Sequence, residues 1–291
     1  MNIDDNFYKY KVGIVLVNYN GAHDTIDCVN SIKESSYINY KVYVVDNGSN
    51  NADKQLLEKI KKDVNLIESN KNLGFSGGNN YGISFAIEDE CDYILLLNND
   101  TIIEKNMLNH MINTIQKHSD VGVLGCRIHY FNDKNSVWFA GGKIVDFMGT
   151  TRHCMKVKSG FEYVSFVTGC CMLIPREVIQ NCGGLSERYF LYYEDADFCK
   201  KIVRNGWRLA VDLDAVIYHK VSSSTKEYSD NYFYYMIRNR FLFIKNNING
   251  IDKIIAYVYS NISLVYKFIK YRKKSIAIGL WDFLRKKEGE K

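Results

Sequence analysis

The chain has 291 residues, of which 46% are hydrophobic and 24% are charged. This is an ordinary globular composition, and the length suits one large α/β domain with an appendage. The formal net charge of +5 is too small to indicate a nucleic-acid-binding protein by itself. No apolar run approaches the length of a membrane span, and the polar start MNIDDNFYKYK is unlike a signal peptide. We therefore expect a cytoplasmic protein.

The eight cysteines of the chain give no sign of a metal site or a disulfide framework. None of them forms a CxxC pair, and no histidine cluster accompanies them. We expect reduced, mostly buried thiols and no zinc site.

The first part of the chain alternates apolar runs with helical patterns. The expected strands are 12–17, 41–45, 64–68, 93–97 and 121–126. The expected helices are 24–34, 53–62, one that reaches residue 88, and 104–117. Between them, the segment KNLGFSGGNN at 71–80 is so rich in Gly and Asn that we expect a shaped loop. These strands lack polar alternation, and they alternate with helices along the chain. Both features predict an α/β fold with a mostly parallel sheet.

The second part is less regular. Residues 127–166 carry short β-type runs and glycines, which predict hairpins or a flap. The expected elements that follow are a strand at 166–174, a short helix begun by Pro175, a helix at 194–205 closed by Gly206, and strand pieces at 208–211 and 215–218. From residue 228 onward the pattern is helical, with candidate helices at 231–246 and 251–273.

Polar residues follow several of the expected strands. Asn18-Tyr19-Asn20, Asp46 and Asn98-Asn99-Asp100 each stand at a strand end, and in an open α/β sheet ligands bind outside those ends. A carboxylate there can hold a divalent cation beside phosphates. A second acidic pair, Glu194-Asp195, starts an expected helix, whose dipole favours the charged form of an acid.

Seven segments resemble, in order and spacing, the family 2 glycosyltransferases of GT-A fold, and most of all their bacterial rhamnosyltransferase branch. The segments are VGIVLVNYNG, VVDNGS, NLGFSGGNN, ILLLNNDT, GCCMLI, LYYEDADFC and AVIYHKVSSS. The resemblance covers about residues 11–225, with a looser likeness through 230–287. It implies a Rossmann-like GT-A domain at 1–226, with a donor half at about 11–126 and an acceptor half at 127–226, and a C-terminal helical region at 227–291.

The resemblance implies an inverting enzyme of bacterial surface polysaccharide synthesis. Its nucleotide-sugar donor would be dTDP-rhamnose, and its acceptor a saccharide hydroxyl, with a lipid-linked saccharide as one form. A UDP-hexose or UDP-GlcNAc transferase of the same family is the alternative.

The resemblance also assigns residues to the donor and the metal. It places Asn18, Tyr19 and Asp46 around the base and ribose, and Asn72 and Gly74 along the same pocket. Asn98, Asn99 and Asp100 occupy the family's DxD position, with Asp100 as the ligand of Mg²⁺ or Mn²⁺. Asn98 stands where the family has its first Asp, so one negative charge is missing and the diphosphate would carry more of the metal binding.

Three further residues take roles from the resemblance. Asp195 would be the general base that deprotonates the acceptor hydroxyl, and Glu194 would assist or position the acceptor. His219 would complete the metal or diphosphate site.

Other interpretations of these residues stay open. Asp46 and His219 also suit structural roles, and Gly77-Gly78 suits a plain bend. Glu194 or Asp197 suits an ion pair with Lys201 or Arg204 at helical spacing, a role favoured for Asp197. A non-catalytic nucleotide-sugar-binding module is a second functional class. A dinucleotide-dependent oxidoreductase is disfavoured, because NYNG stands where its GxGxxG turn would follow the first strand.

The C-terminal region has a charge pattern of its own. From residue 265 to 291, nine Lys and Arg stand against three acids, a net of +6, among Tyr, Phe, Ile and Trp. Such a pattern suits helices lying on an anionic membrane surface. The alternative is a helical hairpin that packs on the domain or on a second copy in a homodimer. No recognisable motif supports a nucleic-acid partner.

Overall fold

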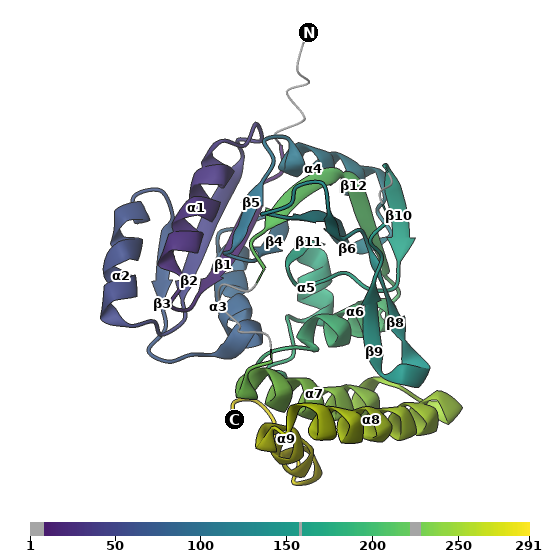
Figure 1. Ribbon diagram of the computed structural model, residues 1–291. Coiled ribbons are helices and arrows are strands. Elements are labelled where there is room, and N and C mark those ends of the chain that lie inside the picture. Colours follow the sequence, from purple (N-terminus) through teal and green to yellow (C-terminus); the bar gives the residue numbers. More distant parts are fainter. Residues whose placement is uncertain (1–8, 157–158, 222–227) are drawn as a thin grey trace.

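The computed structural model describes residues 9–156, 159–221 and 228–291. The N-terminal residues 1–8 and the domain boundary expected near 226 lie outside these ranges. A ten-stranded sheet runs through the molecule in the order β10-β12-β6-β11-β4-β1-β2-β3, with β5 paired to β12 and β7 paired to β6 (Figure 1). The strands are β1 (Val12–Asn18), β2 (Tyr40–Asp46), β3 (Asn65–Glu68), β4 (Tyr93–Leu97), β5 (Thr101–Ile103), β6 (Val121–Tyr130), β7 (Val137–Phe139), β10 (Phe161–Val164), β11 (Cys171–Pro175) and β12 (Arg208–His219).

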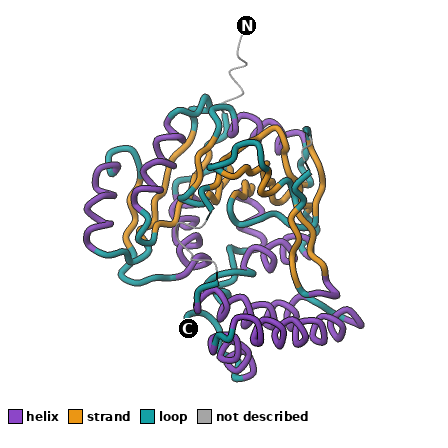
Figure 2. The backbone as a smooth tube through the Cα atoms, viewed as in Figure 1, coloured by secondary structure: helices purple, strands orange, loops and turns teal. Residues whose placement is uncertain are grey.

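Helices flank this sheet, and a two-stranded sheet of β8 (Gly142–Val145) and β9 (Thr150–His153) projects from it (Figures 1 and 2). The helices are α1 (Ala22–Lys33), α2 (Asn51–Leu57), α3 (Gly74–Glu88), α4 (Met107–Lys117), α5 (Arg176–Cys182), α6 (Glu194–Arg204), α7 (Asp230–Asn247), α8 (Gly250–Tyr271) and α9 (Lys274–Leu284). Two 3-10 turns, Glu58–Ile60 and Asp146–Met148, complete the regular structure of the described residues.

The first half of the sheet is parallel, as its apolar strands predict. β1 pairs in parallel with both β2 and β4, and β2 pairs in parallel with β3. All five residues of β4 are buried, which is why this strand has no polar alternation. The α/β class and the mostly parallel sheet are therefore confirmed.

The second half of the sheet is mixed. β11 runs antiparallel to β4 and β6, and β10 runs antiparallel to β12. The hairpin strands expected in 127–166 are present, but the strand expected at 166–174 begins only at Cys171. The two pieces expected at 208–211 and 215–218 form one strand, β12, whose register against β6 shifts between Asp212 and Val216. The polar residues at this bulge interrupt the apolar pattern, so the sequence predicted two strands where the structure has one.

The glycine-rich segment differs most from its prediction. Helix α3 already begins at Gly74, so Gly77 and Gly78 are helical rather than parts of a loop or a bend. The helix packs directly on β1, where a Cβ on Gly82 would lie 2.4 Å from a methyl carbon of Val15. These glycines permit close helix–strand approach, so their density indicates packing as much as turn geometry.

The C-terminal region consists of three helices, α7, α8 and α9, which lie together along one end of the molecule (Figure 1). This confirms the predicted helical extension, although the expected helix at 251–273 is followed by a further one, α9. Within the described residues, no helix combines the length and the apolar character needed to span a bilayer.

Candidate active site

The turn after β4 is held by the residue that precedes β11 and by the first residue of β5. The backbone N–H of Asn98 donates to the carbonyl of Cys170 (2.9 Å), and the Thr101 hydroxyl donates back to the Asn98 carbonyl (2.7 Å). Thr101 then opens β5, where it pairs with His219 at the end of β12. This pairing brings together two residues that are far apart in the sequence, Asp100 and His219.

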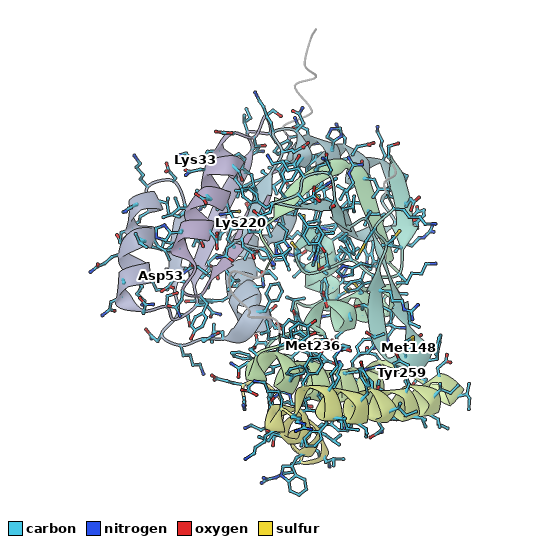
Figure 3. All side chains as sticks on the ribbon, in the orientation of Figure 1. Lys33, Asp53, Met148, Lys220, Met236 and Tyr259 are labelled. Carbon is cyan, nitrogen blue, oxygen red and sulfur yellow. The ribbon has the colours of Figure 1, made fainter. Side chains whose placement is uncertain are left out.

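Asp100 and His219 form a buried pair. Oδ1 of Asp100 lies 3.1 Å from Nε2 of His219, and both residues are buried. The His219 ring packs edge-on against Trp138, with the ring centroids 4.9 Å apart. The next residue, Lys220, bonds Asp24 and Asp27 of α1 at 2.7 Å each, which fixes the end of β12 to that helix. Figure 3 shows Lys220 beside α1.

The chemistry of this pair fits a divalent cation. Two ligands at right angles, each about 2.1 Å from one cation, lie about 3.0 Å apart, close to the separation of Asp100 and His219. A carboxylate with an imidazole suits Mn²⁺ better than Mg²⁺, which prefers oxygen alone. Among residues 9–156, 159–221 and 228–291 there is no group of three or more His, Cys, Asp or Glu that could hold a metal. A cation held at this pair would therefore need further ligands from a diphosphate and water.

The acidic pair opens helix α6 after a strained turn. Tyr192 and Tyr193 both have left-handed backbones, with φ of 69° and 73°, a conformation that costs non-glycine residues energy. Asn239 of α7 stabilises this turn, because its amide donates to the carbonyls of Leu191 (2.8 Å) and Tyr192 (2.9 Å). Strain that is maintained in this way fixes the direction in which Glu194 and Asp195 leave the turn.

Asp195 is half-buried, and both of its carboxylate oxygens are hydrogen-bonded. Its Oδ2 accepts from the Gly169 N–H (3.1 Å) and its Oδ1 from the Ala196 N–H (2.8 Å). Burial raises the pKa of the Asp195 carboxyl above its ordinary value, and these backbone N–H groups oppose that rise. A carboxylate with a raised pKa is a stronger base, which suits a proton acceptor near neutral pH.

Glu194 is less well satisfied than its neighbour. Burial, and then the charge of Asp195, raise the pKa of the Glu194 carboxyl well above its usual range. Its Oε2 is buried and has no hydrogen-bond partner within the described parts of the chain. An ionised carboxylate that is buried without a hydrogen-bond partner destabilises the folded state.

We expect Glu194→Gln to raise the free energy of unfolding at pH 8. The folded-state pKa of the Glu194 carboxyl is above the unfolded value of about 4.3. The protonated carboxyl therefore contributes its full stability below about pH 4.3, and this contribution is lost as pH rises through the folded-state pKa. The advantage of the variant should therefore grow with pH and vanish below about pH 4. Urea unfolding from pH 4 to pH 8 measures it, and an advantage that is independent of pH would contradict this explanation.

Two consecutive residues, Gly169 and Cys170, connect the two acidic centres. Gly169 donates to Asp195, and Cys170 accepts from Asn98. A Cβ on Gly169 would lie 3.2 Å from the ring of Phe75 and 3.5 Å from Cβ of Asp195. The end of β4, the start of α3 and the start of α6 therefore meet at this point.

The expected donor residues lie beside this junction, but most of their polar atoms bond within the protein. Asn18 is fully buried: its amide donates to Ser49 (3.0 Å) and Asp53 (2.6 Å), and its Oδ1 accepts from Thr25 (2.8 Å). Thr25 in turn accepts from the amide of Asn99 (2.8 Å). Asn18 and Asn99 thus belong to one buried network that shapes the strand ends. Figure 3 shows Asp53 on α2.

The other expected donor residues lie near these strand ends: Asp46 ends β2, Asn72 lies in the loop before α3, and Gly74 begins α3. Asp46 is buried, accepts from the Ser49 N–H (3.2 Å) and lies 3.5 Å from Nζ of Lys54. Oδ1 of Asn72 accepts from the Gly74 N–H (2.8 Å). Gly74 has φ +72°, and a Cβ there would lie 2.3 Å from the Phe190 carbonyl oxygen, so only glycine fits. Tyr19, by contrast, is 48% exposed.

Three residues that build this site were not predicted from the sequence. Asn47 accepts from the Leu73 N–H (2.9 Å) and donates to the Gly74 carbonyl (3.0 Å), which fixes the start of α3. Asn239 and Gly169 were missed as well, because their partners lie 47 and 26 residues away. Asn47 stands in an evident Asp-Asn-Gly-Ser turn, which is a usable signal; the other two carry none.

One structural expectation about the acidic helix is wrong. Asp197 pairs with neither Lys201 nor Arg204; its Oδ1 accepts from the Tyr189 hydroxyl (3.2 Å) and the Asn247 amide (2.7 Å). Lys201 instead reaches the carbonyls of Gly183 and Gly184. Helical spacing permits an ion pair, but partners from α7 and the preceding turn outcompete it here.

Comparison with known proteins agrees with this arrangement. The model of the family described as "Glycosyl transferase family 2" matches residues 13–183, a range that ends before the acidic pair but includes the turn after β4. The chain belongs to glycosyl transferase family 2. This confirms that it is a glycosyltransferase, the family that the sequence resembles.

Individual relatives agree with the family. The chain is 27% identical over 251 residues to "Low-salt glycan biosynthesis hexosyltransferase Agl10" of Haloferax volcanii, covering 84% of this chain and 78% of the relative. It is 22% identical over 241 residues to "dTDP-rhamnosyl transferase RfbF" of Shigella flexneri, covering 80% and 79%. A solved structure, a mannosyltransferase of Pyrobaculum calidifontis in complex with GDP-Man and Mn²⁺, superimposes with a TM-score of 0.61 at 14% identity, covering 97% and 89%. That likeness confirms the GT-A fold.

Proposed function

We propose that this family 2 glycosyltransferase moves a sugar, with rhamnose from dTDP-rhamnose as the first candidate, onto a hydroxyl of a saccharide acceptor with inversion at the anomeric carbon. The observation that carries the proposal is the junction at Gly169 and Cys170, which anchors Asp195 on one side and the turn before Asp100 on the other. A base for the acceptor and a group for the diphosphate are needed close together, and this junction supports both.

The reaction we propose is a single displacement. The acceptor hydroxyl gives its proton to Asp195 while its oxygen forms a bond to the anomeric carbon. The bond from that carbon to the phosphate oxygen breaks, and the nucleoside diphosphate leaves with the electron pair. Asp195 suits this step because burial raises its pKa, and because two backbone N–H groups hold its oxygens in place. Glu194, directly beside it, would position the acceptor.

Asp100 and His219 are the residues that would hold Mn²⁺ or Mg²⁺. When bound, the cation would neutralise the charge that grows on the leaving diphosphate. Their separation of 3.1 Å supports this assignment, and so does the Mn²⁺ in the complex of the structurally similar mannosyltransferase. Asn98 in place of an acid supports a site in which the diphosphate completes the coordination.

The donor assignment draws on the relatives. A dTDP-rhamnosyl transferase is among them, which supports dTDP-rhamnose. The hexosyltransferase of glycan biosynthesis supports a role in glycan synthesis, and we propose that the product is a surface polysaccharide. UDP-hexose and UDP-GlcNAc are the alternative donors. Around the base and ribose, Tyr19 is the exposed candidate, whereas Asn18 and Asp46 act through the buried network that holds the pocket's shape.

A thermal-shift panel of nucleotide sugars, with and without Mn²⁺, tests donor and metal together. We expect dTDP-rhamnose to raise the melting temperature more than UDP-glucose, UDP-galactose or UDP-GlcNAc, and Mn²⁺ to enlarge the shift, because a ligand stabilises the state that it binds. A larger shift with a UDP-sugar would reassign the donor. Binding of a donor without any transfer or hydrolysis would instead indicate a non-catalytic binding module.

A further inference from the structure

The outer surface of α8 and α9 is unusually apolar. In α8 only Ala256 and Ser260 are buried. A stripe along the opposite side of this helix is between 42% and 68% exposed, and we call it the α8 stripe: Ile251, Ile255, Val258, Ile262, Val265 and Ile269. On α9, Ile278, Trp281 and Leu284 are 41%, 59% and 62% exposed. An apolar surface of this extent marks an interaction site.

Basic residues accompany this surface. From residue 250 to 291, ten Lys and Arg stand against four acids, a net of +6. Two of the acids are already engaged: Asp282 lies 3.8 Å from Lys287, and Glu288 lies 3.4 Å from Arg188. Lys274 and Arg285 are exposed at the two ends of α9. The partner of this surface must therefore be apolar and negatively charged.

A second copy of the chain fits this surface less well. The α8 stripe has the alternating spacing of four and three residues that a coiled-coil seam requires. The flanking positions of such a seam, however, should carry opposite charges, and here they include Ile254, Phe268 and Tyr266. These flanking side chains are 62%, 45% and 60% exposed, so the apolar surface is wider than a two-helix seam covers. Two copies would also bring two +6 regions together.

We propose that the α8 stripe and the exposed side of α9 dock on an anionic lipid bilayer. Aliphatic side chains would enter the boundary between head groups and acyl chains, Trp281 would lie at the interface, and the Lys and Arg residues would face anionic head groups. The helices would lie along the membrane rather than cross it, in keeping with the absence of a spanning helix from the described residues. Figure 1 shows α8 and α9 together at one end of the molecule.

The docking surface is one helix away from the acidic pair. Helix α7 contacts α9 closely enough that a Cβ on Gly279 would lie 2.7 Å from the Tyr234 carbonyl oxygen. On α7 as well, Asn239 holds the turn that leads into Glu194. A docked enzyme would thus present its acidic pair near the head groups, where a saccharide carried on a lipid is found; this last step depends on the proposed function, whereas the docking itself does not.

Vesicle co-sedimentation of the full chain tests the docking without any transfer reaction. We expect binding to vesicles of phosphatidylglycerol and phosphatidylcholine, little binding to phosphatidylcholine alone, and weaker binding at 0.5 M salt. Val258→Asp with Ile262→Asp should lower binding at least about tenfold. Lys274→Gln with Arg285→Gln should do the same, because each charge near an anionic surface contributes to affinity.

Matched controls separate docking from general effects on the surface. Ile38, which is 69% exposed outside this region, controls for the apolar change as Ile38→Asp, and Lys59→Gln with Lys62→Gln controls for the charge change. Both should leave binding unchanged. Absence of binding to anionic vesicles, or equal loss in the controls, would overturn the proposal. So would a lipid-free dimer in sedimentation velocity that Val258→Asp with Ile262→Asp dissociates, since the surface would then belong to a second copy.

Discussion

Asp195→Asn is expected to lower the turnover of sugar transfer by about 10²–10⁴, the range that general-base catalysis contributes. The amide is nearly the same size as the carboxylate and can still accept from the Gly169 N–H, so the junction with the turn after β4 should persist. Donor binding, measured as the thermal shift with nucleotide sugar, should therefore survive while transfer, measured by release of nucleoside diphosphate, is lost.

Asp197→Asn is the matched control for this variant. Asp197 lies two residues further along α6 and bonds Tyr189 and Asn247 instead of the junction at Gly169. This variant should keep its turnover and lose only stability. Near-wild-type turnover of Asp195→Asn would show that another group accepts the proton. An equal loss in both variants would show that the helix start, and not the carboxylate of Asp195, is what the reaction requires.

The parts of this protein that were predictable are those determined by local patterns. β4 is recognisable because five consecutive residues are buried on both faces of the sheet, and the Asn-Asn-Asp that follows must turn. The position of Asp100 at a strand end follows from these two facts alone. The start of α3 was misplaced because its glycines act through contact with β1, such as that of Gly82 with Val15, and a sequence window does not show that contact.

The contacts that complete the site were not predictable, because they join residues that are distant in the sequence. The Asp100–His219 pair requires β5 and β12 to be neighbours, an antiparallel pairing that depends on the whole sheet order. Asp100 was predicted from its place at a strand end, whereas His219 received its role only through the family resemblance. The support of the acidic pair by Asn239 depends on how α7 docks, and an asparagine within a helix gives no hint of that role.

Asp100→Asn is expected to lower transfer by about 10² or more, because a bound cation supplies several kcal/mol of charge stabilisation at the leaving diphosphate. In the site that we propose, Asp100 and His219 are the two protein ligands, 3.1 Å apart, so the loss of the one carboxylate should weaken cation binding strongly. A readout independent of transfer is the extra rise in melting temperature that Mn²⁺ gives in the presence of dTDP, which should disappear in Asp100→Asn and in His219→Ala.

Two further variants define what this result means. Asp212→Asn replaces another buried aspartate on the strand that carries His219, one that bonds Thr114 at 2.6 Å; it should lower stability but keep the response to Mn²⁺. Asn98→Asp restores the missing charge of the DxD position, and we expect it to lower the Mn²⁺ concentration needed for half of the thermal shift, since a hard cation binds more tightly as carboxylates are added. If Asn98→Asp left that concentration unchanged while Asp100→Asn raised it, the side chain at 98 would face away from the cation. If neither changed it, Asp100 and His219 would form a structural pair, and the diphosphate would have to be held by other groups.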